Sequence, residues 1–167
     1  MMNEGYSDLV NVVNERLKKF NYGADQEIKI PNIVFITYVK RPNLLKVRNL
    51  CAIVDIPSHL KDFSMIQGLF KNIETGLLNK YGNAFLWKEL EIIYIVFSSP
   101  EIFKIIQDHG GKVINQTAFS LNSMMGLSFI NKGDHNYFTY SNWGLYFCGD
   151  HLKEVDALVK EWCSSKR

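Results

Sequence analysis

One run of apolar residues dominates the hydrophobic pattern of the chain, and the rest of the fold is predicted around it. Residues 92–97 are six consecutive apolar residues, most of them β-branched or aromatic. A strand covered on both faces has this pattern, because neither face can then be polar. The run ends in Ser98, Ser99, Pro100 and Glu101, and the last three suit the N-cap and first turn of a helix. The pattern therefore predicts a buried strand that leads directly into a helix.

The remaining apolar and polar positions predict further helices and strands. Apolar residues at helical spacing predict helices over residues 7–20, from Pro57 and Ser58 to about Tyr81, over 100–108, and from Asp150 onwards. Runs of β-branched and aromatic residues predict strands over 33–39, 47–56, 112–121, 126–131 and 137–148, with a break near Ser141 that would divide the last one. Residues 21–32 are predicted to be a polar connection.

These elements predict a single domain over residues 1–167 of the α/β or α+β class. Their order is α-β-β-α-β-α-β-β(-β)-α, and the strands at 33–39 and 47–56 are expected to form an antiparallel hairpin. This order favours one mixed sheet of about five to six strands with helices on both faces. A chain of 167 residues is long enough to bury a hydrophobic core without disulfides or metal.

Two strand-to-helix junctions are the places where we expect a ligand. If the strands that end near residues 56 and 97 are parallel, both junctions open on one edge of the sheet, outside the carboxyl ends of the strands. Helix N-termini at that edge offer free N–H groups and a positive dipole end, which favour a small anionic ligand. The candidate binding residues at the junctions are Asp55, Ser58, Ser98 and Ser99.

The junction residues have a catalytic interpretation and a structural one. Asp55 would orient a hydroxyl group, hold a cation or act as a base, with His59 as a second catalytic candidate, while Ser98 or Ser99 would bind a phosphate or carboxylate group. In the structural interpretation Ser58 and Ser99 are ordinary helix caps and Asp55 satisfies a turn, and such residues are common in turns.

Histidines and cysteines do not predict a metal centre or a nucleophile. Three histidines follow an aspartate, namely His109, His135 and His151, but no two histidines have the spacing of paired metal ligands. Turn and cap chemistry accounts for each of them, so no metal site is predicted. The three cysteines, Cys51, Cys148 and Cys163, are odd in number and widely spaced, which is typical of reduced thiols in a cytosolic protein.

An aromatic block and a basic hairpin tip are the candidate surfaces for partners. The block contains Tyr137, Tyr140, Trp143 and Tyr146. An exposed row of these rings would bind another protein or a second copy of the chain, whereas a sheet covered on both faces would bury them as core. The predicted tip carries Lys40, Arg41, Lys46 and Arg48, and such a charged edge more commonly discourages strand pairing than binds nucleic acid.

Composition adds limits to this picture. The chain is 47% hydrophobic and 22% charged, and its net charge of +2 gives no reason to expect nucleic acid. The start of the sequence lacks the basic and apolar regions of a signal peptide, and the run 92–97 is too short to span a membrane. We therefore expect a soluble cytoplasmic protein.

No motif for catalysis or for a cofactor is present, so the cofactor is left unassigned. The favoured function is the binding of a small ligand or of another protein. The alternative is a hydrolase or nuclease-like enzyme with its site near Asp55 and Ser98 or Ser99.

Overall fold

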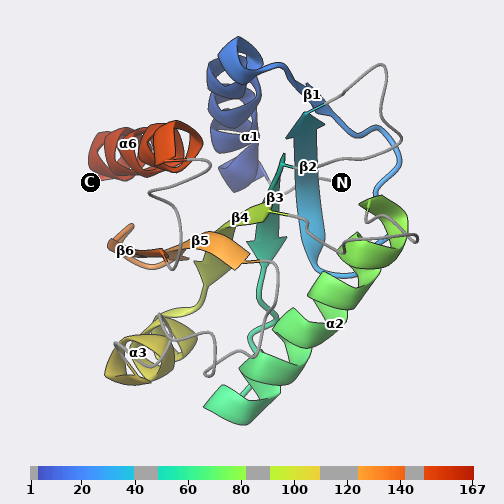
Figure 1. The fold of residues 1–167 in the computed structure, drawn as a ribbon. Coiled ribbons are helices and arrows are strands. Elements are labelled where there is room, and N and C mark those ends of the chain that lie inside the picture. Colours follow the sequence, from blue (N-terminus) through green and yellow to red (C-terminus); the bar gives the residue numbers. More distant parts are fainter. Residues whose placement is uncertain (1–3, 40–48, 82–90, 110–123, 142–148) are drawn as a thin grey trace.

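A mixed sheet of six strands lies at the centre of the protein, in the order β1-β2-β3-β4-β5-β6 (Figure 1). The computed structural model describes residues 4–39, 49–81, 91–109, 124–141 and 149–167. The strands are β1 (Tyr22–Ala24), β2 (Ile33–Val39), β3 (Asn49–Asp55), β4 (Glu91–Ser98), β5 (Met124–Asn131) and β6 (Tyr137–Ser141). The helices are α1 (Glu4–Leu17), the 3-10 turn η1 (Lys18–Phe20), α2 (Phe63–Tyr81), α3 (Pro100–His109) and α6 (Gly149–Lys166).

The strand directions confirm the predicted mixed sheet. β1 pairs with β2, β2 with β3, and β5 with β6 in the antiparallel sense. β3 pairs with β4 and β4 with β5 in the parallel sense. The two parallel connections in the chain contain α2 and α3, because parallel neighbours need a crossover rather than a tight turn.

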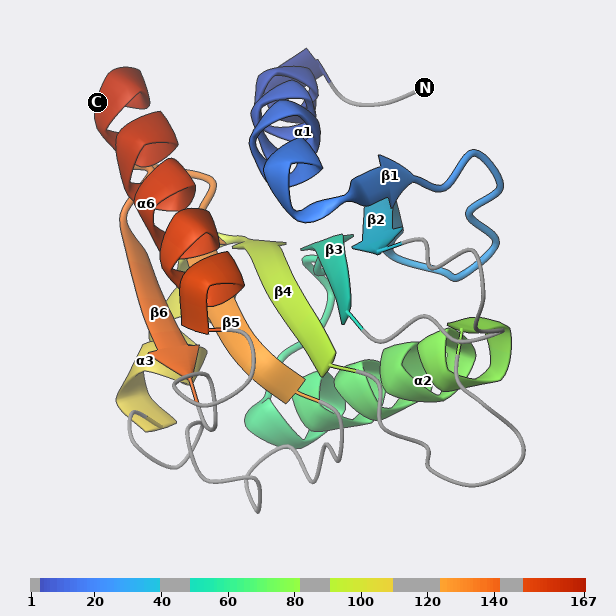
Figure 2. The ribbon, with the colours of Figure 1, turned by 45° about the horizontal axis from the view of Figure 1, so that its top comes forward.

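Helices cover both faces of the sheet, as predicted (Figure 2). The side chains of β4 alternate between the two layers: Ile92, Tyr94 and Val96 belong to the core under α2 and α3, whereas Ile93, Ile95 and Phe97 belong to the core under α1 and α6. The whole run is at most 2% exposed. This confirms that the longest apolar run is a strand buried on both faces.

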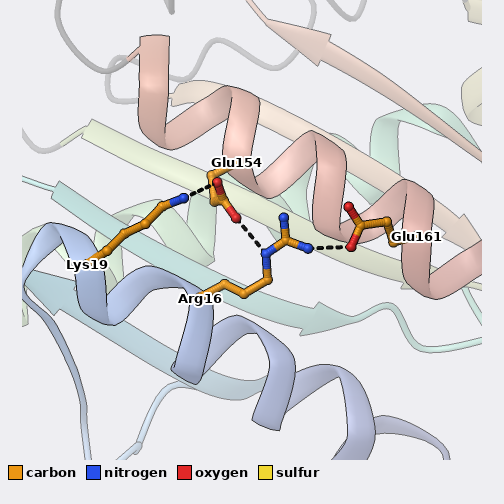
Figure 3. Close-up of polar contacts among 4 residues, drawn as sticks. All are labelled: Arg16, Lys19, Glu154 and Glu161. Atoms are coloured by element: carbon orange, nitrogen blue, oxygen red, sulfur yellow. Dashed lines mark hydrogen bonds and ion pairs between the residues drawn. The ribbon is translucent and has the colours of Figure 1, made fainter.

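The helices α1 and α6 are the first and last of the chain, and ion pairs join them across one face of the sheet (Figure 3). The Arg16 Nε donates to the Glu154 carboxylate at 2.5 Å, and the same guanidinium also pairs with Glu161. Lys19 pairs with the other oxygen of Glu154. The hydrogen bonds from Lys19 and Arg16 hold the pKa of Glu154 below its usual value, although its burial acts in the opposite direction.

Four sequence predictions about element boundaries were wrong. The first helix begins at Glu4, three residues before the predicted start, and ends at Leu17, where the 3-10 turn Lys18–Phe20 follows. Residues 22–24 form the edge strand β1 rather than a polar connection. The helix α2 begins at Phe63, not at Pro57 or Ser58, because the Asp62 carboxylate accepts a hydrogen bond from the Met65 N–H at 2.8 Å and so caps the helix. β5 begins at Met124, two residues before the predicted start. The strand predicted over 112–121 and the end of the one predicted over 137–148 lie outside the described residues.

No helix in the described ranges is long and apolar enough to cross a lipid bilayer.

The short strand β1 is fixed by a residue directly after it, Asp25. Its backbone N–H donates to the Ile36 carbonyl at 2.9 Å, and its carboxylate accepts hydrogen bonds from Lys80 at 2.7 Å and from the Tyr81 hydroxyl at the end of α2. Burial alone would raise the pKa of Asp25, but these bonds and one from the Glu27 N–H outweigh it and lower the pKa to about 2. Distant residues of α2 therefore hold this edge of the sheet.

Replacement of Lys80 by glutamine tests this anchor through the pH dependence of stability. The folded-state pKa of Asp25 lies below its ordinary value of 3.8, so its contribution is fully present above about pH 4 and is lost as the pH falls towards 2. We expect Lys80→Gln to lower the free energy of unfolding by about 1 kcal/mol at neutral pH. Urea titrations should show this difference shrinking towards pH 2, whereas the exposed control Lys71→Gln should match the wild type. A difference that stays constant over this pH range would contradict the assignment.

Candidate functional site

Three parallel strands end together at one edge of the sheet, which we call the carboxyl edge. Asp55 of β3 lies opposite Phe97 of β4, and Phe97 lies opposite Ile130 of β5. The prediction that the ends of the strands near residues 56 and 97 face the same edge is therefore confirmed. Polar residues that follow these strands are the natural place to look for a site in a sheet of this kind.

Asp55 is the centre of a three-residue group that we call the Asp55 cluster. Its Oδ2 accepts a hydrogen bond from the Tyr6 hydroxyl of α1 at 2.8 Å, and its Oδ1 pairs with the ammonium group of Lys132, in the turn between β5 and β6. The Asp55 side chain is 27% exposed and that of Lys132 is 34% exposed. Both carboxylate oxygens are thus occupied by groups of the protein itself.

The electrostatics of the cluster favour a stable ion pair over acid–base chemistry. Burial raises the pKa of Tyr6, and the hydrogen bond to Asp55 raises it further, so the phenol stays a neutral donor. Burial acts to lower the pKa of Lys132, but its hydrogen bonds to Asp55 and Tyr6 and the charge of Asp55 outweigh burial and raise it. Neither group is poised to lose a proton near neutral pH.

The two serines after β4 have structural contacts. Ser98 is fully buried, and its hydroxyl donates to the Ile130 carbonyl at 3.4 Å. The Ser99 hydroxyl accepts a hydrogen bond from the Ile102 N–H at 3.4 Å and so caps α3. Glu101 occupies the first turn of the same helix, where its own backbone N–H and Ser99 lower its pKa. That carboxylate already complements the positive end of α3.

Ser58 and His59 lie in an exposed turn between β3 and α2. No contact among the described residues joins either of them to the Asp55 cluster. The start of α2 comes after this turn and is capped by Asp62. Ser99 caps α3, whose first turn contains Glu101, and the acidic Asp62 itself caps α2. A negative side chain therefore already lies at each of these helix starts, which weakens the case for an anionic ligand at either of them. The binding and catalytic roles of Asp55, Ser58, His59, Ser98 and Ser99 stay predictions.

A polar hollow of about 530 Å³ lies on the other side of the carboxyl edge, between α3 and the turn that joins β5 to β6. Its volume is within the range of small-molecule sites. The buried residues Phe103 and Asn131 and the half-buried Tyr137 contribute to its lining. The other lining residues are exposed and mostly polar, namely Pro100, Lys104, Gln107, Asp108, Asp134 and Asn136.

The turn that lines the hollow is ordered by its own hydrogen bonds. The Asn131 Oδ1 accepts from the Gly133 N–H at 2.8 Å, and the Asp134 carboxylate accepts from the backbone N–H and the side-chain amide of Asn136 at 2.9 and 2.6 Å. His135 has a φ of 56°, and its N–H donates to the Asn131 carbonyl at 3.0 Å. The polar groups that face the hollow are therefore held in place before any ligand arrives.

Asn131 is the most informative residue of this lining. It is only 7% exposed, and its Oδ1 is used by Gly133. No described residue accepts a hydrogen bond from its amide nitrogen, which is not among the buried side-chain atoms that lack a partner. Solvent in the hollow therefore reaches the amide donors of Asn131, and an acceptor group of a ligand could take the place of that water.

The turn between β5 and β6 contributes residues both to the Asp55 cluster and to the lining of the hollow. Lys132 belongs to the Asp55 cluster, and its backbone N–H donates to the Ser98 carbonyl at 3.0 Å. The next residue, Gly133, approaches α3 so closely that a Cβ atom there would lie 3.0 Å from the Pro100 Cγ. Asn131, Asp134 and Asn136 then line the hollow. The Asp55 cluster therefore holds the turn from one side while the hollow lies on the other.

Other residues singled out in the sequence lie elsewhere. Tyr137 and Tyr140 are half-buried on β6, whereas Trp143 and Tyr146 lie outside the described residues, as does the basic tip at 40–48. Cys51 and Cys163 are free and buried, and burial raises their pKa values to about 12 and about 11. Within the described ranges, no group of three or more histidine, cysteine or acidic side chains is arranged to hold a metal ion.

Neither the contact between Tyr6 and Asp55 nor the hollow could be predicted from the sequence. Tyr6 lies 49 positions before Asp55, and the lining of the hollow combines a helix with a turn that begins 22 positions after that helix ends, counting from His109 to Asn131. The only available signal was the turn sequence from Asn131 to Asn136, which predicts a turn but not what lies opposite it.

No protein-family model matches the chain, and neither the curated proteins nor the solved structures include a significant match.

The Asp55→Asn variant tests whether the cluster fastens α1 and the β5–β6 turn to the sheet. We expect the free energy of unfolding to fall by about 1–2 kcal/mol, since Lys132 loses its counter-ion and Tyr6 loses a charged acceptor. Urea unfolding measures the change. The control Asp8→Asn removes the exposed pair with Lys166 and should cost about 0.5 kcal/mol or less. If Asp55→Asn costs no more than this control, the cluster does not have the structural role assigned to it.

Proposed function

We propose that the protein is a binding domain for a small polar molecule, and that the hollow between α3 and the β5–β6 turn is its binding site. The observation that carries the proposal is the nine-tenths buried Asn131, whose amide donors have no acceptor among the described residues while its oxygen is held by Gly133. These donors are reached by solvent in the hollow, and the Gly133 contact holds the amide group in place, so a ligand acceptor can replace water at a donor that is already oriented.

The chemistry of the lining supports a polar ligand. Amide, carboxylate and ammonium groups surround the hollow, and the rings of Phe103 and Tyr137 offer a smaller apolar area. Most small-molecule sites are lined mainly by apolar side chains, so a hollow lined mainly by polar groups favours a ligand that is itself polar and can pair with them. The position at the carboxyl end of β5 fits the general placement of sites in such sheets.

The enzyme alternative has less support. A hydrolase or nuclease-like site at Asp55 would require the carboxylate to release Tyr6 and Lys132, which occupy both of its oxygens. We therefore propose binding rather than catalysis.

Nuclear magnetic resonance tests the proposal with a panel of probes added one at a time at millimolar concentration. The panel contains neutral sugars and polyols, nucleosides, dicarboxylates and the free amino acids. We expect at least one class to shift the amide signals of residues 131–137 and 103–108. The Asn131→Asp variant keeps the oxygen that Gly133 needs and removes the amide donors, so affinity should fall about tenfold or more.

The exposed control Lys160→Gln on α6 should bind the same probe with unchanged affinity. Amide shifts that map away from these residues, or a panel in which no probe shifts them, would contradict the proposed function.

A further inference from the structure

Two opposite charges on one face of α3 set the character of the hollow. Lys104 and Asp108 both line it, and they are four positions apart on the helix, which places them about one turn apart on the same side. Neither side chain forms an ion pair with a described residue. The hollow therefore presents a cation and an anion side by side.

The local physics of the helix does not explain this pair of charges. A lysine placed four residues before an acidic residue is the weaker orientation for a pair within a helix. Asp108 also lies in the last turn of α3, where the helix dipole disfavours a negative charge. Asp108 is thus unfavourable for the helix itself, which makes it a candidate for a role in the hollow.

The other acidic residue of the lining, Asp134, is engaged in hydrogen bonds within the turn. The Asp134 carboxylate accepts two hydrogen bonds from Asn136 within the turn. Asp134 keeps its negative charge, but Asp108 is the lining carboxylate that accepts no hydrogen bond from a described residue, and we therefore assign it to a ligand cation. Lys104 is the lining cation, and Asn131 supplies a second donor for a ligand oxygen. The rings of Phe103 and Tyr137 complete the site with apolar surface.

We infer that the ligand of the hollow is a small zwitterion of the free α-amino acid class. Its carboxylate pairs with Lys104 and accepts from the Asn131 amide, its ammonium group pairs with Asp108, and its side chain lies against Phe103 and Tyr137. This inference rests on the proposed function, since it names the ligand class of the same site.

The test uses the full chain and the twenty free L-amino acids, each alone, with calorimetry and amide chemical shifts as readouts. The best binder is then compared with its N-acetyl derivative, which lacks the ammonium charge, and with its amide, which lacks the carboxylate. We expect each derivative to bind about tenfold more weakly or worse, because each loses one charge-assisted contact.

Substitutions of the two charges then assign the contacts. Lys104→Gln should weaken binding of the free amino acid and leave binding of its amide unchanged, because the amide has no carboxylate to pair with Lys104. Asp108→Asn should weaken binding of the free amino acid and leave binding of its N-acetyl derivative unchanged, because that derivative has no ammonium group to pair with Asp108. The exposed control Lys71→Gln on α2 should leave all affinities unchanged. Both charges are exposed, so the variants should fold, which an unchanged amide spectrum outside the site verifies.

The outcomes separate the two proposals. Binding of sugars, polyols, nucleosides or dicarboxylates in the hollow without binding of amino acids would overturn the inference and leave the proposed function standing. Equal affinities for an amino acid and its two derivatives would also overturn the inference. The absence of any binding at residues 103–108 and 131–137 would overturn both.

Discussion

Lys132 fastens the turn after β5 to the carboxyl edge of the sheet, and the candidate site depends on this one attachment. Its backbone N–H donates to the Ser98 carbonyl at 3.0 Å, and its ammonium group pairs with Asp55. The first contact extends the parallel pairing of β4 and β5 by one residue beyond the strand. The second joins the turn to β3, two strands away. Together they fix where Asn131, Asp134 and Asn136 stand opposite α3.

This attachment is possible because the strands on which it acts are parallel and in register. Asp55, Phe97 and Ile130 lie side by side across three strands, so their following residues emerge at one level. Tyr6 of α1 reaches the carboxyl edge from the face that α1 and α6 cover. The centroid of its ring lies 4.3 Å from the centroid of the Phe97 ring. The Asp55 cluster therefore links a terminal helix, a central strand and the turn that lines the hollow.

The sequence predicted those features that a local pattern determines. Six apolar residues in a row identified β4, and the serine, proline and glutamate after it identified the start of α3. The sequence also predicted that β3 and β4 end at the same edge of the sheet, because a helix between two neighbouring strands is typical of a parallel crossover. It did not predict β1, since a three-residue strand depends on Lys80 and Tyr81 of α2. Tyr6 and the hollow were missed for the same reason, because their contacts join residues far apart in the chain.

The contacts at the carboxyl edge do not favour the anionic ligand that the helix N-termini suggested. Helix N-termini suggested an anion, yet Ser99 and Asp62 cap those helices, and Glu101 already lies at the positive end of α3. The polar groups available to a ligand instead line the hollow, namely Lys104 and Asp108 on α3 and the Asn131 amide on the turn. They include both signs of charge, which favours a zwitterionic ligand over an anionic one.

Native-state hydrogen exchange at the backbone amide of Lys132 tests the central claim most directly, because this N–H makes the contact that fastens the turn. The account predicts that it exchanges as slowly as the amides of β4, through openings of the whole sheet. It also predicts much faster exchange at the backbone amide of Asp134, an exposed residue of the same turn whose N–H donates to no backbone carbonyl of the described residues. Exchange of the Lys132 amide as fast as that of Asp134 would contradict the account, since the turn would then not be held at the carboxyl edge.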